Sequence, residues 1–493
     1  MVLQYDFWRH TTSADFRLRK SYKKKMPIPS TRKGEVKANI GERLDQMPWT
    51  NFHSRVTLAL GIGWLLDSFE VNVIGNVLGI LKKLWQVTDV QASALVTVWL
   101  VGIMVGALLF GYLADRFGRR KLFILTLLLY ASFTVISAIS PGYYFFMVFR
   151  FLTAIGVGAE YSAINAAIGE IIPARFRGRA NATVMNFWPV GAIAAALLSL
   201  YFINLLPPSV GWRFAFGLGA VVALFTIWAR RALPESPRWL AERGRREEAL
   251  EVMQHIESRS SHFDLSELHP GQEESSAPGF FKQVLVLIRN HPGRLALGSL
   301  LDFTEAAGYY GIFAFLPLVV LPRVNITEEK VPWFFLIGNL GAVAGGALAA
   351  TLLDKAGRKW TVTSFYLLAA LSMIVMGLAT LRQSPGWVLA SFVVVNFSAT
   401  GSWVSAYPTF SEIFPTCLRS TGIGFSVAFG RIGAAISPLI LVALAEHASV
   451  MDAFAVLGGF YLVGAMVMVP WILYGPEGRG KALEILGGES LGA

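Results

Sequence analysis

The sequence predicts an all-α membrane protein with 12 transmembrane helices in two pseudo-symmetric six-helix bundles. The first observation is composition: of 493 residues, 54% are hydrophobic and 15% are charged, whereas about a quarter of the residues in soluble domains are charged. The second is the recurrence of apolar runs of about 20 residues, the length of helix that crosses a hydrocarbon core. The third is an internal repeat that divides the chain into two halves.

Polar segments separate the apolar runs and define the domain order. The central loop is rich in Glu, Ser and Arg, and it includes an expected amphipathic helix at Glu242–Ile256. In chain order we expect an N-terminal tail at 1–54, a first bundle at 55–232, the central loop at 233–293, a second bundle at 294–475 and a C-terminal tail at 476–493.

Each bundle is expected to hold six spans, each ending where charged or turn-forming residues interrupt the apolar run. In the first bundle the spans lie near 55–80, 91–114, 122–140, 143–170, 180–205 and 212–232. In the second they lie near 295–320, 333–353, 361–381, 387–411, 421–446 and 452–474.

Four landmarks of the first half recur in the second at nearly constant offset, which indicates an internal repeat of the kind found in secondary transporters. The matched pairs are Leu65–Glu70 with Leu300–Glu305, Asp115–Lys121 with Asp354–Lys359, Glu170–Pro173 with Glu412–Pro415, and Pro234–Arg238 with Pro476–Arg479.

Several motifs resemble those of the major facilitator superfamily. Gly111–Lys121 resembles its loop 2–3 signature, and Pro234–Leu240 resembles a motif of its sugar-porter-like branch. Asp67–Glu70 is similar to the paired-acid motif in the first span of metabolite and aromatic-acid proton symporters, and Gly158–Tyr161 resembles a run in organic-acid permeases. The resemblance implies the major facilitator fold and transport by alternating access. The seventh span departs from sugar porters, because Asp302 and Glu305 stand there and the paired glutamines do not.

The distribution of basic residues predicts the orientation in the membrane. The net charge is +11, but the basic residues gather in the N-terminal tail and in short loops beside apolar spans, as the positive-inside rule requires. The loops 115–121, 175–179, 230–246 and 355–359 all fall on one side if the spans alternate. We therefore expect both termini in the cytoplasm and the protein in the plasma membrane, which is the inner membrane in a bacterium. Nucleic acid is not an expected partner.

The sequence lacks the residues that several classes of protein function require. Cys417 is the single cysteine, and the seven histidines lie in tails, loops or span ends, so we expect no metal site and no cofactor. No phosphate-binding glycine loop of the GxxxxGK[ST] type is present, so we expect no ATP-driven step. The expected partners are a small-molecule substrate, protons and the lipid bilayer, and we expect a monomer. The chain is not expected to be an enzyme.

Ionisable side chains inside spans are costly and usually face a bundle interior or a water-filled cavity. At 1.5 Å rise per residue, Glu70 in the first span and Arg150 in the fourth fall at the same depth, so we expect them to pair. Asp67 is three residues from Glu70 and shares its helix face. We predict that Glu70, Asp67 and Arg150 couple transport to protons; the alternative is a purely structural ion pair.

The seventh span repeats the acid pair. Asp302 and Glu305 share a face, and Glu305 falls at about the depth of Arg431 in the eleventh span, which suggests a second acid–arginine pair. The alternative is that Asp302 hydrates near the cytoplasmic interface. Together with Glu160 in the fourth span, these residues are candidates for substrate binding.

Amides and aromatic residues inside the spans complete the candidate pocket. Trp188 stands beside Pro189, and the tyrosines of the seventh span lie among glycines, where a cavity can satisfy loosened helix backbone. Lone aromatic residues in spans are more often packing or interfacial anchors. The candidates are Asn186, Trp188, Tyr309, Tyr310, Asn396, Trp403 and Tyr407.

Charges near the cytoplasmic ends are expected to gate the transporter. The resemblance implies that Asp115 faces the N-terminal end of the eleventh span, where the helix dipole attracts a carboxylate, and that Arg119 holds it there. The alternative is that these charges only set topology. The remaining gating candidates are Glu170, Arg179, Glu235, Arg238, Asp354, Arg358, Glu412 and Arg419.

The sequence thus predicts a secondary active transporter, with proton-coupled symport of a small organic acid or related metabolite as the favoured function. A sugar or polyol uniporter or symporter, and an organic-cation or drug antiporter, remain as alternatives. A non-transporting receptor is disfavoured, because no long extramembrane domain is evident.

Overall fold

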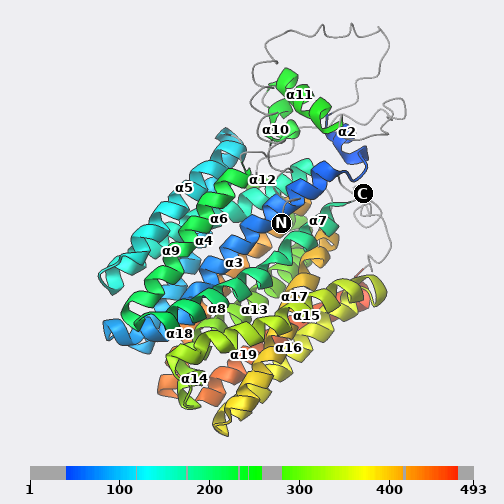
Figure 1. Ribbon diagram of the computed structural model, residues 1–493. Helices are drawn as coiled ribbons and strands as arrows, with labels where there is room; N and C mark the ends of the chain where they lie inside the picture. The colour runs from blue at the N-terminus through cyan, green and yellow to red at the C-terminus, as the bar shows by residue number, and fades with distance from the viewer. Residues whose placement is uncertain are drawn as a thin grey trace, which may run out of the picture.

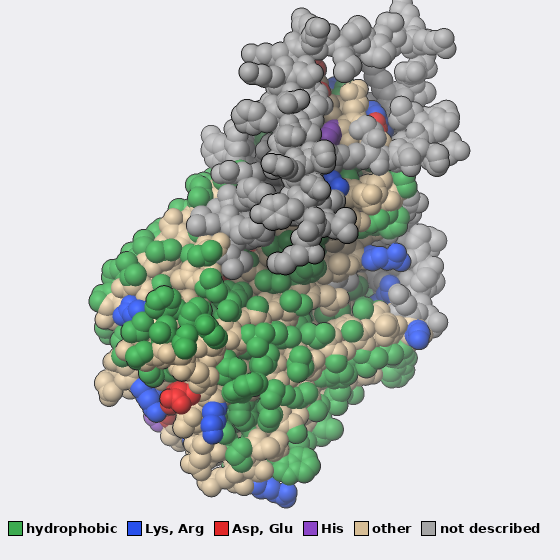
Figure 2. Space-filling view, in the orientation of Figure 1, with side chains coloured by type: hydrophobic (Ala, Val, Ile, Leu, Met, Phe, Trp, Pro, Cys, Tyr) green, Lys and Arg blue, Asp and Glu red, His purple; other side chains and the backbone are tan. Residues whose placement is uncertain are grey.

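The computed structural model describes residues 40–117, 119–173, 176–230, 234–242, 244–257, 280–414 and 418–475. Every regular element in these ranges is helical (Figure 1). Nine helical segments of the described chain are long and apolar enough to cross a membrane. Hydrophobic side chains cover the flank of the molecule, and charged side chains lie mostly towards its ends (Figure 2).

The first bundle contains the six predicted spans, one of them as two helices. Within it α4 packs on α6, α3 packs on α8, and α5 packs on both α6 and α9. Its helices are α3 (Asn51–Trp85), α4 (Asp89–Phe117), α5 (Arg119–Ala138), α6 (Tyr143–Ile171), α7 (Arg177–Met185), α8 (Phe187–Leu205) and α9 (Pro208–Arg230).

The second bundle repeats this plan. The helix α13 packs on α18, α15 packs on α17, and α16 packs on α17 and α19. Its helices are α13 (Pro292–Phe315), η3 (Leu316–Val320), α14 (Leu321–Arg323), η4 (Glu328–Lys330), α15 (Val331–Lys355), α16 (Arg358–Leu381), α17 (Pro385–Ile413), α18 (Arg419–His447) and α19 (Val450–Tyr474).

Two helix pairs, α4 with α18 and α8 with α15, make the principal contacts between the bundles. In the first pair the Thr97 hydroxyl donates to the Ala435 carbonyl at 2.8 Å. The backbone of α3 approaches α8 so closely that a Cβ added at Gly191 would overlap the Leu65 carbonyl. Glycine at this crossing therefore brings α8, and the residues that follow Asn186, against α3.

Local sequence explains where the long helices begin and end. Thr50 and His53 form a capping box at the start of α3, and Gln86 ends that helix in the left-handed conformation at φ 50°. Proline stands at the first turn of α13, α15 and α17, where its missing N–H has no helical partner to lose. Ser449 caps α19 by accepting the Asp452 N–H at 3.1 Å.

Two of the predicted spans are not continuous α-helices. The fifth is broken between α7 and α8 at Asn186, three residues before Pro189. The seventh passes into the π-helical turn η3, which contains Pro317 and is fully buried. Proline removes a helical hydrogen bond and π-turns accommodate the change in register, so both breaks follow from prolines inside the runs.

Four short helices, α2 (Ile40–Gln46), α10 (Pro237–Glu242), α11 (Arg246–Glu257) and α12 (Phe280–Asn290), lie outside the long spans. Three of them, α2, α10 and α11, gather at one end of the molecule (Figure 1). The amphipathic helix expected at Glu242–Ile256 begins only at Arg246, because Gly244 adopts φ +73° and interrupts it. Glycine adopts this conformation at little steric cost.

Candidate functional site

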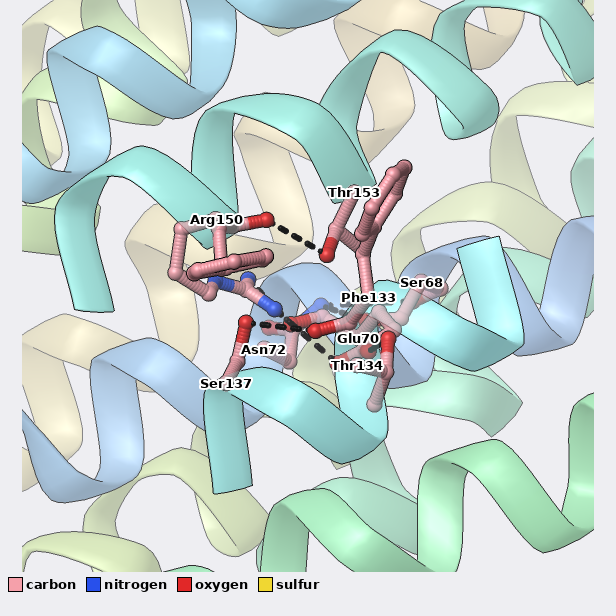
Figure 3. Close-up of polar contacts among 9 residues, drawn as sticks. Ser68, Glu70, Asn72, Phe133, Thr134, Ser137, Arg150 and Thr153 are labelled. Atoms are coloured by element: carbon pink, nitrogen blue, oxygen red, sulfur yellow. Dashed lines mark hydrogen bonds and ion pairs between the residues drawn. The ribbon is translucent and has the colours of Figure 1, made fainter. Parts of the chain in front are cut away.

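A buried salt bridge between α3 and α6 forms the centre of the first bundle. An Arg150 guanidinium nitrogen lies 3.2 Å from Glu70 Oε2, and the two side chains are 1% and 0% exposed. A second guanidinium nitrogen donates to the Glu70 backbone carbonyl at 3.2 Å. The Thr134 hydroxyl on α5 donates to Glu70 Oε1 at 2.5 Å (Figure 3). The structure thus brings together the pair that helix depth predicts, and adds Thr134.

Aromatic rings enclose the arginine of this pair. The Arg150 guanidinium lies 3.7 Å from the centroid of the Trp99 ring and 4.9 Å from that of Phe216. A guanidinium over aromatic faces gains cation–π attraction, and the gain is larger when water is excluded. Trp99 and Phe216 are buried residues of α4 and α9. Arg150 therefore contacts α4 and α9 in addition to the Glu70 carboxylate.

Two further acids lie in the same bundle. Asp67 on α3 and Glu160 on α6 are both buried, and both act electrostatically on the Tyr130 hydroxyl together with Glu70 and Arg150. Three carboxyl groups, those of Asp67, Glu70 and Glu160, therefore lie within electrostatic reach of Tyr130 in this interior. The sequence analysis did not identify Tyr130, because a single tyrosine in the apolar run of α5 does not indicate a function.

An aromatic cluster spans the interface between the bundles. The Trp188 and Trp403 rings meet edge to face at 5.4 Å, and Trp64 lies 5.7 Å from Trp188. The Trp188 indole N–H donates to the Tyr309 hydroxyl at 3.0 Å, joining α8 to α13. The sequence analysis named Trp188, Trp403 and Tyr309 but missed Trp64, which directly precedes the Leu65–Glu70 landmark.

Arg431 on α18 extends the cluster into the second bundle. It donates to the Tyr310 hydroxyl at 3.3 Å and interacts electrostatically with Asp302 and Glu305. The carboxylate of Asp302 lies directly against the backbone of Gly430, where any Cβ would overlap it. Tyr407 is within electrostatic reach of all three charged groups. The direct Glu305–Arg431 pair stays a prediction.

The two amides predicted to line the pocket, Asn396 and Asn186, do not share the contacts of the aromatic candidates. The Asn396 amide donates to the Phe392 carbonyl of its own helix at 3.1 Å. Asn186 is exposed at the break between α7 and α8, where a Cβ added to Gly346 on α15 would lie 3.2 Å from its side-chain oxygen. Neither amide contacts the charged groups around Arg431 in these arrangements, so their part in binding stays a prediction.

The gating candidates fall into two groups. The side chains of Asp115, Arg119, Asp354, Glu412 and Arg419 lie outside the described residues. Among the others, Arg358 donates to the Leu353 carbonyl at 3.0 Å, the Glu235 carboxylate accepts the Ser236 N–H at 3.2 Å, Glu170 is half-buried and Arg179 is exposed.

Arg238 has a partner that the sequence analysis did not name. Asp45 on α2 binds Arg238 through one carboxylate oxygen and Arg177 through the other, each at 2.7 Å. On the same helix Arg43 forms a bidentate pair with Glu257 on α11, at 2.7 and 2.8 Å. The helix α2 therefore ties the segment before the first span to the central loop and to the turn after α6.

Two bundles of six spans each, with buried charged groups in both and an aromatic cluster between them, are the architecture of transporters of the major facilitator superfamily. Residues 16–484 match the family model described as "Sugar (and other) transporter". The chain belongs to this family, and it is therefore a transporter and not an enzyme.

The most informative relatives are bacterial metabolite transporters. The chain is 29% identical to a niacin transporter of Acinetobacter baylyi, over 91% of this chain and all of the relative. It is 30% identical to a putative niacin/nicotinamide transporter of Bacillus subtilis, over 86% of this chain and 96% of the relative. A cis,cis-muconate transport protein of Acinetobacter baylyi is 25% identical, over 82% of this chain and 90% of that protein.

Solved structures confirm the predicted fold. The partially occluded, inward-open xylose transporter of Escherichia coli superposes with a TM-score of 0.70 at 21% identity, covering 88% of this chain and all of that one. At this identity the likeness shows the fold alone. The predicted all-α, two-bundle architecture is confirmed.

Proposed function

We propose that this protein is a proton-coupled symporter that imports a small carboxylic acid with an aromatic or otherwise unsaturated planar skeleton. The observation that carries the proposal is the Glu70–Arg150 pair, which is sealed from solvent in the interior of the first bundle. A transporter without ion coupling has no need of a titratable acid at this depth, where the group is costly to keep charged.

The contacts of Glu70 suggest how a proton acts. When Glu70 is ionised, it accepts hydrogen bonds from both Arg150 and Thr134. When Glu70 takes a proton, its attraction for the guanidinium falls, while Arg150 keeps its contacts with Trp99 and Phe216. Loss of the ion pair weakens the link between α3 and α6 and leaves the hydrogen bond from Arg150 to the Glu70 carbonyl. Because α3 also carries Trp64 of the aromatic cluster, protonation and substrate binding are linked through one helix.

The cluster and its arginine support the substrate class. Flat aromatic side chains favour a planar ligand through offset or edge-to-face contacts, and a guanidinium favours a carboxylate. Both features meet at Tyr310, which contacts Arg431 by a hydrogen bond and the Tyr309 ring edge to face at 5.3 Å. Niacin and muconate, the substrates named for two relatives, are small planar acids.

Uptake into proteoliposomes tests this function. Purified protein is reconstituted, an inside-alkaline pH gradient is imposed, and labelled niacin, cis,cis-muconate and xylose are supplied separately. We expect accumulation of at least one acid above its external concentration, dependent on the gradient and absent after a protonophore. Uptake of xylose alone, or uptake of the acid that only equilibrates under the gradient, would contradict the proposal.

Orientation and assembly are part of the same proposal. We propose that the end holding α2, α10 and α11 is cytoplasmic, with both termini on that side, and that the protein works as a monomer in the inner membrane. The basic N-terminal tail and basic loops support this orientation. Labelling of single cysteines introduced at Lys83 and Arg43 in a Cys417→Ser background, with a reagent that does not cross the membrane, tests it: only the Lys83 position should react in intact cells.

A further inference from the structure

The short helix α12, which directly precedes the first span of the second bundle, carries an exposed apolar stripe. Phe281, Leu285 and Ile288 are four and three residues apart, so they share one face of the helix. Their side chains are 86%, 52% and 49% exposed. Contiguous exposed apolar surface on a protein marks an interaction site more often than chance. The stripe is therefore a candidate interaction surface.

The amphipathic helix α11, in the same central loop, is built differently. It buries its apolar residues Ala249, Met253 and Ile256 and exposes a polar face. The apolar side of α11 is thus already packed within the protein, as expected for a helix that covers a small core of its own. The stripe of α12 keeps about half or more of its surface accessible, so packing within the described chain does not account for it.

The opposite face of α12 fixes the direction of the stripe. Leu287 is fully buried, and the Thr421 hydroxyl donates to the Gln283 side-chain oxygen at 2.5 Å, which fastens α12 to the first turn of α18. The helix also packs on α13. Gln283 and Leu287 stand on the far side of the helix from Leu285. The stripe therefore points away from the second bundle.

On α13 the exposed surface continues into the membrane-spanning region. Pro292, Ala296 and Leu300 are exposed and recur every four residues, so they form one face. Phe303, on the same face, contacts aromatic rings of α18 and α19, whereas Glu305 stands on the other side of the helix. This face of α13 is thus directed outward, to lipid, and the stripe of α12 lies where it begins.

Two cations flank the stripe. Lys282 and Arg289 are exposed and seven residues apart, which places both on one side of α12 next to the apolar residues. The helix contains no acidic residue. Long basic side chains can pack their stems along apolar surface and extend the charge outward. Helices that lie in a membrane interface combine an apolar face at the acyl boundary with basic residues at the headgroups.

We propose that α12 lies in the membrane interface and binds anionic lipid, with Phe281, Leu285 and Ile288 among the upper acyl chains and Lys282 and Arg289 on the headgroup phosphates. Charge complementarity and the continuity of the stripe with the lipid-facing side of α13 both favour a bilayer as the partner. The contact joins the bilayer surface to the first turns of α13 and α18, the two helices that carry the buried charges of the second bundle.

Fluorescence quenching in nanodiscs tests the position of the stripe. Full-length protein with Leu285→Cys in a Cys417→Ser background is labelled with a small fluorophore, in a bilayer of equal parts phosphatidylcholine and phosphatidylglycerol. Lipids with a nitroxide near the top of the acyl chain should quench this probe at least about threefold more than a probe at Gln254→Cys, an exposed polar position on α11. A probe at Ile288→Cys should behave like the one at Leu285→Cys.

The headgroup preference is measured with the Leu285→Cys probe. The nitroxide is carried by phosphatidylglycerol in one sample and by phosphatidylcholine in another, at the same total composition. The anionic carrier should quench at least about twofold more, because basic residues near the surface attract anionic lipid. Lys282→Gln/Arg289→Gln should abolish this preference. Arg245→Gln/Arg246→Gln is the matched control, since it removes two exposed cations beside α11 and should keep the preference.

Two results would overturn the proposal. If the Leu285→Cys probe is quenched no more than the Gln254→Cys probe, the stripe faces water or another protein segment and not the acyl chains. If the two nitroxide carriers quench equally, or both double variants lose the preference to the same extent, α12 does not recognise anionic lipid. These measurements need neither solute nor a pH gradient, so their outcome is independent of the proposed transport function.

Discussion

The indole N–H of Trp188 donates to the hydroxyl of Tyr309 at 3.0 Å, so a single hydrogen bond joins α8 of the first bundle to α13 of the second. The two bundles rock relative to each other during alternating access. A hydrogen bond between them is therefore expected to form in some states of the transporter and to break in others. The Trp188 ring also contacts Trp64 and Trp403. The bond therefore stands where substrate binding and bundle movement meet.

Removal of this bond by Trp188→Phe should weaken substrate binding while keeping most of the ring contact. A net hydrogen bond contributes about 0.5–1.5 kcal/mol, which corresponds to a loss in affinity of roughly 2- to 10-fold. Trp188→Ala removes the ring contacts as well and should lose considerably more. Titration of both variants with the same labelled acid measures the difference. Equal losses in the two variants would show that the hydrogen bond contributes nothing and that the ring alone matters.

The pair between Arg43 on α2 and Glu257 on α11 should hold the pre-span segment on the central loop. It is bidentate and only partly exposed, so its contribution lies at the upper end of the range for surface pairs, about 1 kcal/mol. Arg43→Glu and Glu257→Arg should each lower the thermal transition of the purified protein. The double variant restores a pair of opposite charges and should recover most of the loss. A double variant no better than either single one would mean that the two residues do not interact in solution.

The regular helices made most of the architecture predictable. Asp302 and Glu305 could be placed on one face, and Glu70 opposite Arg150, because rise per residue fixes depth in a continuous helix. Positions that depend on side-chain packing between helices could not be placed. Trp64 meets Trp188 only because α3 and α8 cross closely at Gly191. The segment around Asp45 has the composition of a polar tail, so the sequence did not identify Asp45 as a partner. Only the fold shows that Arg177 and Arg238 both bind it.

Arg431 should contribute both charge and geometry to substrate binding. Arg431→Ala removes both, and should weaken the affinity for an aromatic acid by about 100-fold, within the range seen when one partner of a buried charge pair is removed. Arg431→Lys keeps the charge but loses the planar fork that bonds two oxygens, so its loss should be smaller, about 10-fold. Binding of benzoate and of labelled niacin to both purified variants makes the comparison. Affinities like wild type in both would remove Arg431 from the pocket.

The strongest prediction concerns Glu70, whose carboxylate accepts from Arg150 and Thr134 and is fully enclosed. Glu70→Gln keeps the shape and a hydrogen-bonding side chain but fixes the group in an uncharged form, like the protonated acid. Solute should still bind and exchange across the membrane, since a symporter carries its solute while the coupling proton is bound. Because the variant can neither take up nor release a proton at this position, a pH gradient should no longer drive accumulation.

Two assays on the same proteoliposomes distinguish this from simple loss of activity. Counterflow, in which unlabelled internal solute drives entry of labelled solute, should retain at least about a third of the wild-type rate in Glu70→Gln, because exchange needs no net proton movement; gradient-driven accumulation should fall to the equilibrium level. Thr134→Val is the matched control, since it removes one hydrogen bond to the carboxylate but leaves the titratable group, and it should keep gradient-driven uptake at a reduced rate. If Glu70→Gln still concentrates solute in response to the gradient, Glu70 is not the coupling site and Asp67 becomes the next candidate on the same face of α3.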